Sequence, residues 1–251
     1  MSQVILDARH RYWKVDDDGS KTRIPGVTTV IGQLDKPALI GWAAKITARY
    51  LIDRIPDIVA GNLVLSPEDA EKLFYQAKNE PNRLKEEAGA IGTQAHTAVE
   101  YYLKTGRIPK GATEPVQQAI GAFVSLHAEM GWGEVLASEQ LLYSPTYCYC
   151  GTLDVVAMIG ARRYLVDVKT AKGFYSEMPM QLAAYAEAWE EMHPDLPIEG
   201  MGVVRLSKED GLPYWGENGI EKPSDHATVR AVEFQKFLCL LTYYELNHRE
   251  A

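Results

Sequence analysis

Two aspartates and a lysine in neighbouring hydrophobic runs are the residues of this sequence whose types and spacing could do chemistry. Asp154 stands in the run YCYCGTLDVVAMI, and Asp167 and Lys169 stand in the next run, RRYLVDVKTA. If Gly160 and Ala161 form a two-residue hairpin turn, Asp154 faces Asp167 across the strand pair, with Cβ atoms about 4.5 to 5.5 Å apart. Asp167 and Lys169 are two residues apart, so their side chains leave the strand on the same face. The sequence therefore predicts two carboxylates side by side with an ammonium group nearby.

Such a group of charges favours the binding of a divalent metal ion. Two carboxylates at this distance do not both stay ionised in a partly buried place without a counter-ion, and their hard oxygens prefer Mg²⁺ or Mn²⁺. A metal ion there binds a phosphate oxygen and lowers the pKa of a water, and the Lys169 ammonium stabilises negative charge on phosphorus. The arrangement predicts hydrolysis of a phosphodiester. The alternative is a set of surface ion pairs, because Asp-Val-Lys often occurs by chance.

A third acid comes from the preceding predicted strand, EVLASEQLLYS. If the turn after this strand is centred between Pro145 and Thr146, Glu139 lies opposite Thr152 and diagonal to Asp154. Glu139 then belongs to the same group of charges.

Two predicted helices carry further polar side chains at helical spacing. Thr93, His96 and Glu100 share one face of AIGTQAHTAVEYY, where a neutral His96 imidazole could bind a metal ion. Gln181 and Tyr185 stand four residues apart in MQLAAYAEAW and could reach a nucleotide base or phosphate. The alternative for each is a structural role, because a single histidine on a helix is more often packed or at the surface, and an aromatic residue at helical spacing usually belongs to the core.

In their order and spacing, these residues resemble the RecB-type branch of the PD-(D/E)XK nuclease superfamily. Its members include the CRISPR-associated exonucleases, the mitochondrial genome maintenance exonuclease and many phage exonucleases. The stretch PGVTTVIGQLDKPALIGWAAK is also similar to the N-terminal part of phage-encoded members. The motifs that carry the resemblance lie within residues 92–185 and are Gly92-Thr93-x-x-His96, Glu139, Gly151-x-x-Asp154, Asp167-x-Lys169 and Gln181-x-x-x-Tyr185.

The resemblance implies a restriction-endonuclease-like α/β fold and a role for each matching residue. Lys169 would be the catalytic lysine, and Glu139 would support the site. The ligands of Mg²⁺ or Mn²⁺ would be His96, Asp154, Asp167 and the Val168 carbonyl. Gln181 and Tyr185 would orient the lysine or the DNA strand, and the whole set expected to contact substrate is Gln181, Tyr185, Thr93, Thr170, Arg162 and Lys172.

The cysteines separate this chain from part of that superfamily. Several relatives hold an iron–sulfur cluster on four cysteines, whereas this chain has only Cys148, Cys150 and Cys239, without ligand spacing. No cluster is expected, and all three cysteines are predicted to be reduced thiols. Cys148 and Cys150 are predicted to be small buried side chains on one face of a strand.

Composition limits how the protein can hold nucleic acid. The 251 residues carry a net charge of −8, which excludes binding by overall charge, so any attraction to DNA must be concentrated in a local basic surface. Candidates for phosphate contacts are Lys36, Lys45, Arg49, Arg162, Arg163 and Lys172, and Tyr214 and Trp215 are candidates for stacking on bases, with packing as the alternative. No run approaches the roughly 20 apolar residues of a membrane span, and the N-terminus lacks a signal core. We expect a cytoplasmic protein of a bacterium or a phage-infected host cell, without membrane contact.

The predicted elements form one nuclease domain, residues 1–251, in three parts. Residues 1–35 form a hairpin or flap, with strands in HRYWKV and PGVTTVIGQL. Residues 36–131 form a helical half in which Pro81 opens the second of two consecutive helices. Residues 132–251 form the α/β core: a three-strand meander, the helix EMPMQLAAYAEAWEEM, a strand in GMGVVRLS, a loop over 208–224, and a last helix that buries Phe234, Phe237, Leu238, Leu241 and Tyr244.

These expectations favour a metal-dependent DNA nuclease, specifically an exonuclease that acts on DNA ends or single strands in recombination, repair or phage DNA processing. No Walker lysine loop is present, so a recombinase, a single-strand-binding protein or a helicase would be a partner. Two alternatives remain: a structure-selective endonuclease with the same residues, and a DNA-binding or assembly module that does not cut.

Overall fold

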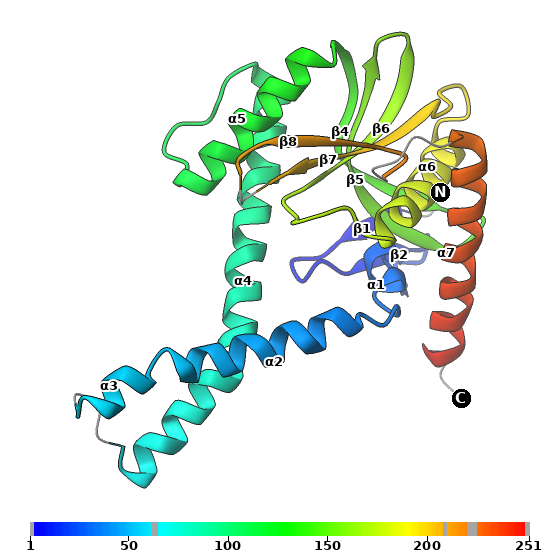
Figure 1. The fold of residues 1–251 in the computed structure, drawn as a ribbon. Helices are drawn as coiled ribbons and strands as arrows, with labels where there is room; N and C mark the ends of the chain where they lie inside the picture. The colour runs from blue at the N-terminus through cyan, green and yellow to red at the C-terminus, as the bar shows by residue number, and fades with distance from the viewer. Residues whose placement is uncertain (1–2, 62–64, 208–209, 220–224, 249–251) are drawn as a thin grey trace. The chain divides into compact units, whose positions relative to one another are not determined.

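The computed structural model describes residues 3–61, 65–207, 210–219 and 225–248 (Figure 1). The chain divides into two compact units. We name the first the sheet unit, which comprises Met1–Leu34 and Gln94–Ala251, and the second the helical unit, which comprises Asp35–Thr93. The helical unit thus contains only part of the helical half predicted for residues 36–131.

A five-stranded mixed sheet forms the centre of the sheet unit, in the order β4-β5-β6-β7-β8. Strands β6 and β7 are parallel, and the other neighbours are antiparallel. The strands are β4 (Trp132–Ser144), β5 (Tyr149–Ile159), β6 (Arg162–Lys169), β7 (Gly200–Leu206) and β8 (Pro213–Glu217). The predicted meander, crossover helix and following strand are confirmed, and the mixed α/β architecture is compatible with a restriction-endonuclease-like fold.

The prediction was wrong at β8, which lies in the segment expected to be a loop. The glycines and prolines in and around this segment are typical of a loop, but the five residues PYWGE form a short strand that pairs with β7. A side chain at Gly202 of β7 would overlap the Trp215 ring, so the glycine allows that ring to lie flat against the sheet. Trp215 therefore packs within the fold, which is the alternative weighed against base stacking.

Helices cover the sheet, and Figure 1 shows α5 on one side of it and the α6–α7 pair on the other. The three helices are α5 (Glu114–Glu129), α6 (Glu177–Met192) and α7 (His226–His248). Trp189 of α6 and Leu153 and Leu165 of the sheet belong to one fully buried cluster. Phe234, Phe237, Leu241 and Tyr244 are buried as predicted, and Leu238 is partly buried against the same cluster.

The N-terminal segment forms a small antiparallel sheet, β1 (Gln3–Leu6), β2 (Tyr12–Val15) and β3 (Lys21–Ile24), followed by the short helix α1 (Val27–Ile31). The stretch PGVTTVIGQL was predicted to be a strand, and this was wrong. Val27, Val30 and Ile31 follow helical spacing, and their burial against the main core decides in favour of a helix. A bridge between Gly26 and Cys150 joins this segment to β5.

The helical unit consists of α2 (Pro37–Ile52), α3 (Ile55–Val59) and the first part of α4 (Pro67–Thr105), which continues beyond Thr93 into the sheet unit. The prediction of two helices meeting at Pro81 was wrong, because Pro81 lies inside α4. Its ring is buried, and the strong helix formers on both sides continue the helix although proline removes one internal hydrogen bond.

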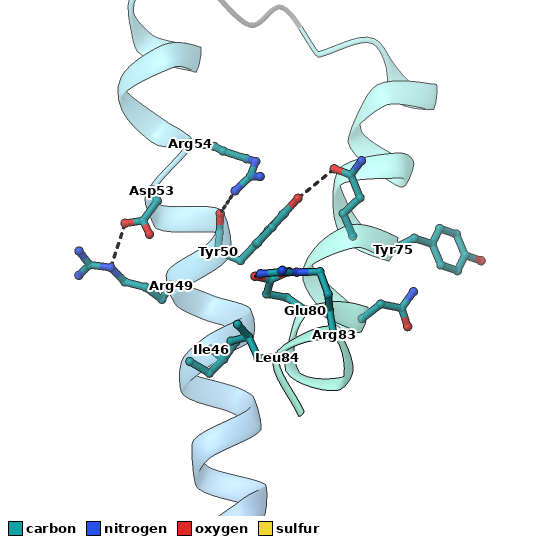
Figure 2. A pocket seen from close by; sticks show the side chains of 11 residues that line it. Ile46, Arg49, Tyr50, Asp53, Arg54, Tyr75, Glu80, Arg83 and Leu84 are labelled. Atoms are coloured by element: carbon teal, nitrogen blue, oxygen red, sulfur yellow. Dashed lines mark hydrogen bonds and ion pairs between the residues drawn. The ribbon is translucent and has the colours of Figure 1, made fainter. Parts of the chain in front are cut away.

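Polar contacts join α2 to α4 around a cavity of about 810 Å³ (Figure 2). Tyr50 of α2 points toward α4 and donates a hydrogen bond to Gln76 Oε1 at 3.2 Å. The Arg54 guanidinium lies 3.5 Å from the centre of the Tyr50 ring. Neither α2 nor α3 contains a buried residue. Surface contacts rather than an apolar core therefore hold these helices.

Candidate metal centre

The hairpin of β5 and β6 positions the two predicted aspartates. Gly160 adopts φ +60° and turns the chain together with Ala161, and the pairs from Ile159↔Arg162 to Val155↔Val166 confirm the predicted register. Asp154 and Asp167 are the next residues in this register, just beyond the last ladder pair.

The carboxylate of Asp154 bonds to the backbone of β6 just beyond the last paired residues of β5 and β6. Its Oδ2 accepts the N–H of Val168 at 2.6 Å. A backbone donor in a strand has a fixed direction, so this hydrogen bond orients the Asp154 side chain. The Val168 amide thus holds Asp154 in place, whereas the motif resemblance had implied that the Val168 carbonyl binds the metal ion.

The buried Asp167 forms an ion pair with the partly exposed Lys169, whose Nζ lies 2.7 Å from Asp167 Oδ1. Asp167 is 1% exposed, and its second oxygen, Oδ2, is buried with no hydrogen-bond partner among the described residues. Burial raises the pKa of Asp167 to about 6, against the opposing effect of the Lys169 charge. Burial alone would lower the pKa of Lys169, but Asp167 and Asp154 raise it more, so Lys169 keeps its charge.

His96, Glu139 and Asp154 bring three possible ligand atoms within 4.8 Å of one another. His96 Nδ1 lies 3.5 Å from Asp154 Oδ2 and 3.9 Å from Glu139 Oε1. The three residues come from α4, β4 and β5, so only the tertiary structure brings them together. The motif resemblance had implied that His96 and Asp154 are ligands and that Glu139 supports the site.

The predicted register of Glu139 was wrong by two residues. Leu141, not Glu139, pairs with Thr152, because the turn after β4 contains the four residues Pro145–Cys148 and is centred later than expected. A shift of two keeps a side chain on the same face of a strand. Glu139 lies between the paired residues Ser138 and Gln140, at the level of Asp154, and adopts φ +51°.

Charge coupling within this group is strong. Burial alone would lower the pKa of His96, but the charge of Asp154 and hydrogen bonds to Asp154 and Glu139 raise it to about 10. Burial alone would raise the pKa of Asp154, but His96, then Lys169, lower it below its usual value. The protonated imidazole thus supplies the positive charge that the carboxylates need, and a divalent cation at the same nitrogen would take over this role.

Gln181 and Tyr185 of α6 lie beneath the site rather than on its surface. Gln181 is 9% exposed and Tyr185 is 4% exposed, and Gln181 Nε2 donates to Tyr185 Oη at 3.1 Å. Burial, then the charges of Asp167 and Asp154, raise the pKa of Tyr185. Its ring fills the space that a side chain at Gly151 would occupy. In this structure the pair is thus buried against the strands that carry the site.

The other predicted contact residues lie in different surroundings. Arg162 is at the opposite end of β6, roughly 16 Å along the strand from Asp167, where it donates to Tyr164 Oη and the Glu199 carbonyl. It is therefore not brought to the site. Thr170 and Lys172 directly follow β6, and the Lys172 carbonyl accepts from Arg205. Thr93 belongs to the helical unit, where its hydroxyl donates to the Gly89 carbonyl.

The cysteine prediction holds for one residue of the pair. Cys150 is buried, but Cys148 is exposed, because it lies in the turn before β5 with φ +55° and not on the strand.

The structure also adds a contact that the sequence did not indicate. The Tyr12 hydroxyl of β2 lies 3.2 Å from Thr152 Oγ1, which is two residues before Asp154 on β5.

No helix in the described part of the chain combines the length and the apolar character that a membrane crossing requires.

The searches found no matching protein-family model and no matching curated protein. Two solved structures resemble parts of the fold. The crystal structure of SSO0001 is 15% identical and aligns over 60% of this chain and 72% of that chain, with a TM-score of 0.27. A structure from Eubacterium rectale, described as a "Putative exonuclease", is 9% identical over 64% of this chain and 75% of that chain, with a TM-score of 0.34. Both TM-scores are too low to carry an argument about activity.

Proposed function

We propose that this protein is a divalent-metal-dependent DNA nuclease. One observation carries the proposal: the buried carboxylate of Asp167 holds the ammonium of Lys169, and its other oxygen has no hydrogen-bond partner among the described residues, beside the group of His96, Glu139 and Asp154. An unsatisfied buried carboxylate oxygen is costly unless it serves a ligand.

The residues fit a divalent cation. Asp167 Oδ2 is an acceptor without a donor in the described chain, and three further ligand atoms from His96, Glu139 and Asp154 lie within 4.8 Å of one another. Carboxylate-rich sets favour Mg²⁺ or Mn²⁺. A cation held there would lower the pKa of a water and offset the negative charge that develops on phosphorus.

The chain's own residues prepare this chemistry. The Asp167 carboxylate fixes the Lys169 ammonium, so the ammonium can stabilise a phosphoryl oxygen without first giving up its own hydration. The Val168 amide orients Asp154, and Tyr185, held by Gln181, closes the site from below. Because Asp167 and Asp154 are largely shielded from solvent, their charges act more strongly than they would in water.

The substrate class and mode of attack follow the motif resemblance. We propose DNA as the substrate and an exonuclease as the type of enzyme, acting on ends or single strands. A structure-selective endonuclease would use the same residues, and a recombinase, a single-strand-binding protein or a helicase is the kind of partner proposed.

The test compares linear DNA, labelled at each end in turn, with closed circular DNA in Mg²⁺, in Mn²⁺ and in chelator. We expect metal-dependent loss of label from linear DNA, and a decrease of roughly 10²- to 10³-fold in Asp167→Asn and Lys169→Gln. The matched controls are Asp53→Asn and Lys72→Gln, which alter exposed ion-paired residues of the helical unit. A Mn²⁺-induced rise in melting temperature that Asp154→Asn abolishes would test metal binding without activity.

The outcomes separate the alternatives. Full activity in Asp167→Asn or in chelator would contradict the proposal. Cutting of closed circles would favour the endonuclease. Protein that shifts DNA but never cuts it with either metal would favour the module that only binds.

A further inference from the structure

A groove in the sheet unit combines basic and aromatic side chains away from the candidate metal centre. Its volume is about 920 Å³, and it is formed by the N-terminal sheet, the end of β4 and the last turns of α7. We name it the basic groove, defined by Lys14, Lys21, Arg23, Tyr143, Tyr244 and His248.

The cations of the basic groove are available to a ligand. Lys21 and Arg23 are exposed on β3, an edge strand of the N-terminal sheet, and neither forms an ion pair within the described chain. Lys14 is partly exposed and lies 3.0 Å from Asp16. Glu245 is the acid in the lining. In a chain with a net charge of −8, this is a local surface of the opposite sign.

The aromatic side chains add flat apolar faces to these charges. The Tyr244 and His248 rings stack with centroids 4.0 Å apart and an interplanar angle of 16°. The half-buried Tyr143 ring of β4 also lines the groove. Aromatic faces together with spaced cations are the features by which proteins bind single-stranded nucleic acid without reading its sequence.

The groove is connected to the strand that carries Asp154. Tyr143 pairs with Cys150 of β5, and the Cys150 amide donates to the Pro25 carbonyl next to β3. Asp154 stands four residues further along β5, which corresponds to roughly 13 Å. A strand of a few nucleotides spans this distance.

We propose that the basic groove binds one single strand of DNA a few nucleotides away from the scissile phosphate. This inference rests on the proposed function, because it takes the metal centre as the place of cutting. Lys14, Lys21 and Arg23 would contact phosphates, and Tyr143 or the exposed His248 ring, which stacks on the buried Tyr244, would contact bases. An acidic peptide would satisfy the cations but would make no use of the aromatic side chains of Tyr143 and His248.

The two exposed cysteines provide a matched trapping experiment. Cys148 lines the basic groove, whereas Cys239 is exposed on α7 outside it. A single-stranded oligonucleotide carries a pyridyl disulfide on a short tether near its middle. Attack by a cysteine thiolate joins protein to DNA by a disulfide and releases pyridine-2-thiol. We expect the conjugate to form with Cys239→Ala and to be lost with Cys148→Ala. Equal yields from both variants would overturn the proposal.

A second measurement tests the charges. Binding of a single-stranded oligonucleotide is measured as a function of salt for Lys21→Ala/Arg23→Ala and for the control Arg107→Ala/Lys110→Ala, which removes the same charge from exposed positions outside the groove. Two lost phosphate contacts should reduce the slope of log K against log salt by roughly 1.4 in the groove variant. An unchanged slope would overturn the proposal, as would a poly-glutamate peptide whose binding depends on Lys21 and Arg23 while DNA binding does not.

A small substrate keeps this inference distinct from the nuclease proposal. Hydrolysis of bis(p-nitrophenyl) phosphate needs only the metal centre, so the groove variant should retain it while losing cleavage of oligonucleotides. Loss of both activities together would contradict the groove. If the unaltered protein hydrolyses nothing but still traps DNA at Cys148, the groove is supported and the nuclease proposal fails.

Discussion

The sheet unit and the helical unit use the same kinds of charged residue in opposite surroundings. In the sheet unit, Asp167 and Lys169 pair beside a core in which Leu153 and Trp189 are buried. In the helical unit, Arg49 and Asp53 pair at 2.9 Å with side chains that are 70% and 53% exposed. Burial is the difference: it changes the pKa of a carboxylate and strengthens its field, whereas solvent screens an exposed pair.

The same contrast applies to apolar residues. Val59 of α3 is 81% exposed and Ile40 of α2 is 72% exposed, whereas Leu153 is completely buried. The cavity in Figure 2 is correspondingly lined by paired surface charges such as Arg83 with Glu80. Among the described residues, the charged side chain that is fully buried, Asp167, belongs to the sheet unit, which is where we propose that the chemistry takes place.

The largest expected effect comes from the core. Leu153→Ala should lower the free energy of unfolding by about 2–5 kcal/mol, because it leaves a cavity in a fully packed cluster. Val59→Ala in the helical unit should change it by less than about 0.5 kcal/mol. Urea unfolding followed by circular dichroism would measure both. Equal effects would break the contrast between the two units.

An intermediate effect is expected from the ion pair between α6 and α7. Arg230 bonds both oxygens of Glu190 at 2.6 and 2.7 Å. Arg230→Gln should therefore cost about 1.5–3 kcal/mol at neutral pH. Burial alone would raise the pKa of Glu190, but the opposing effect of Arg230 is larger, so the pKa lies below its usual value. The ionised pair therefore stabilises the fold at pH values above the ordinary glutamate pKa. The difference between variant and parent should shrink as the pH falls below about 4.

The matched change in the helical unit is Arg83→Gln, which removes the ion pairs of the exposed Arg83 side chain with Glu80 and Glu87. Its effect should be smaller than that of Arg230→Gln and should disappear in high salt, because solvent ions screen exposed charges. Urea titrations at low and high salt would compare the two variants. A larger, salt-resistant effect of Arg83→Gln would contradict the assignment of the helical unit as a surface-stabilised element.

Alanine substitutions at two glycines should change stability with opposite signs. A Cβ at Gly151 would lie 2.3 Å from the Tyr185 ring, so Gly151→Ala should destabilise by about 1–3 kcal/mol. A Cβ at Gly89 of α4 meets nothing within 4 Å, so Gly89→Ala should stabilise the helix by roughly 1 kcal/mol. Urea unfolding followed by circular dichroism would measure both substitutions. The same sign for both substitutions would refute the close approach of Tyr185.

Local patterns predicted some parts of the site accurately. The alternation around Asp154 and Asp167, with the turn at Gly160, indicated both strands and their register, because a two-residue hairpin leaves few alternatives. The longer turn at Pro145–Cys148 permits several geometries, and the register of Glu139 was wrong by two for that reason. The helix α1 was mistaken for a strand, because five residues of valine, threonine and isoleucine satisfy both patterns.

By itself, the sequence determined the hairpin and the order of the chemical residues, since both depend on neighbours along the chain. The tertiary structure alone decided which carboxylate is buried with Lys169 and that His96 meets Glu139 and Asp154. It also decided that Arg162 lies far along β6 and that Tyr185 is enclosed. The physical reason is that burial and electrostatic coupling depend on segments that are distant in sequence, and only the packed fold sets those distances.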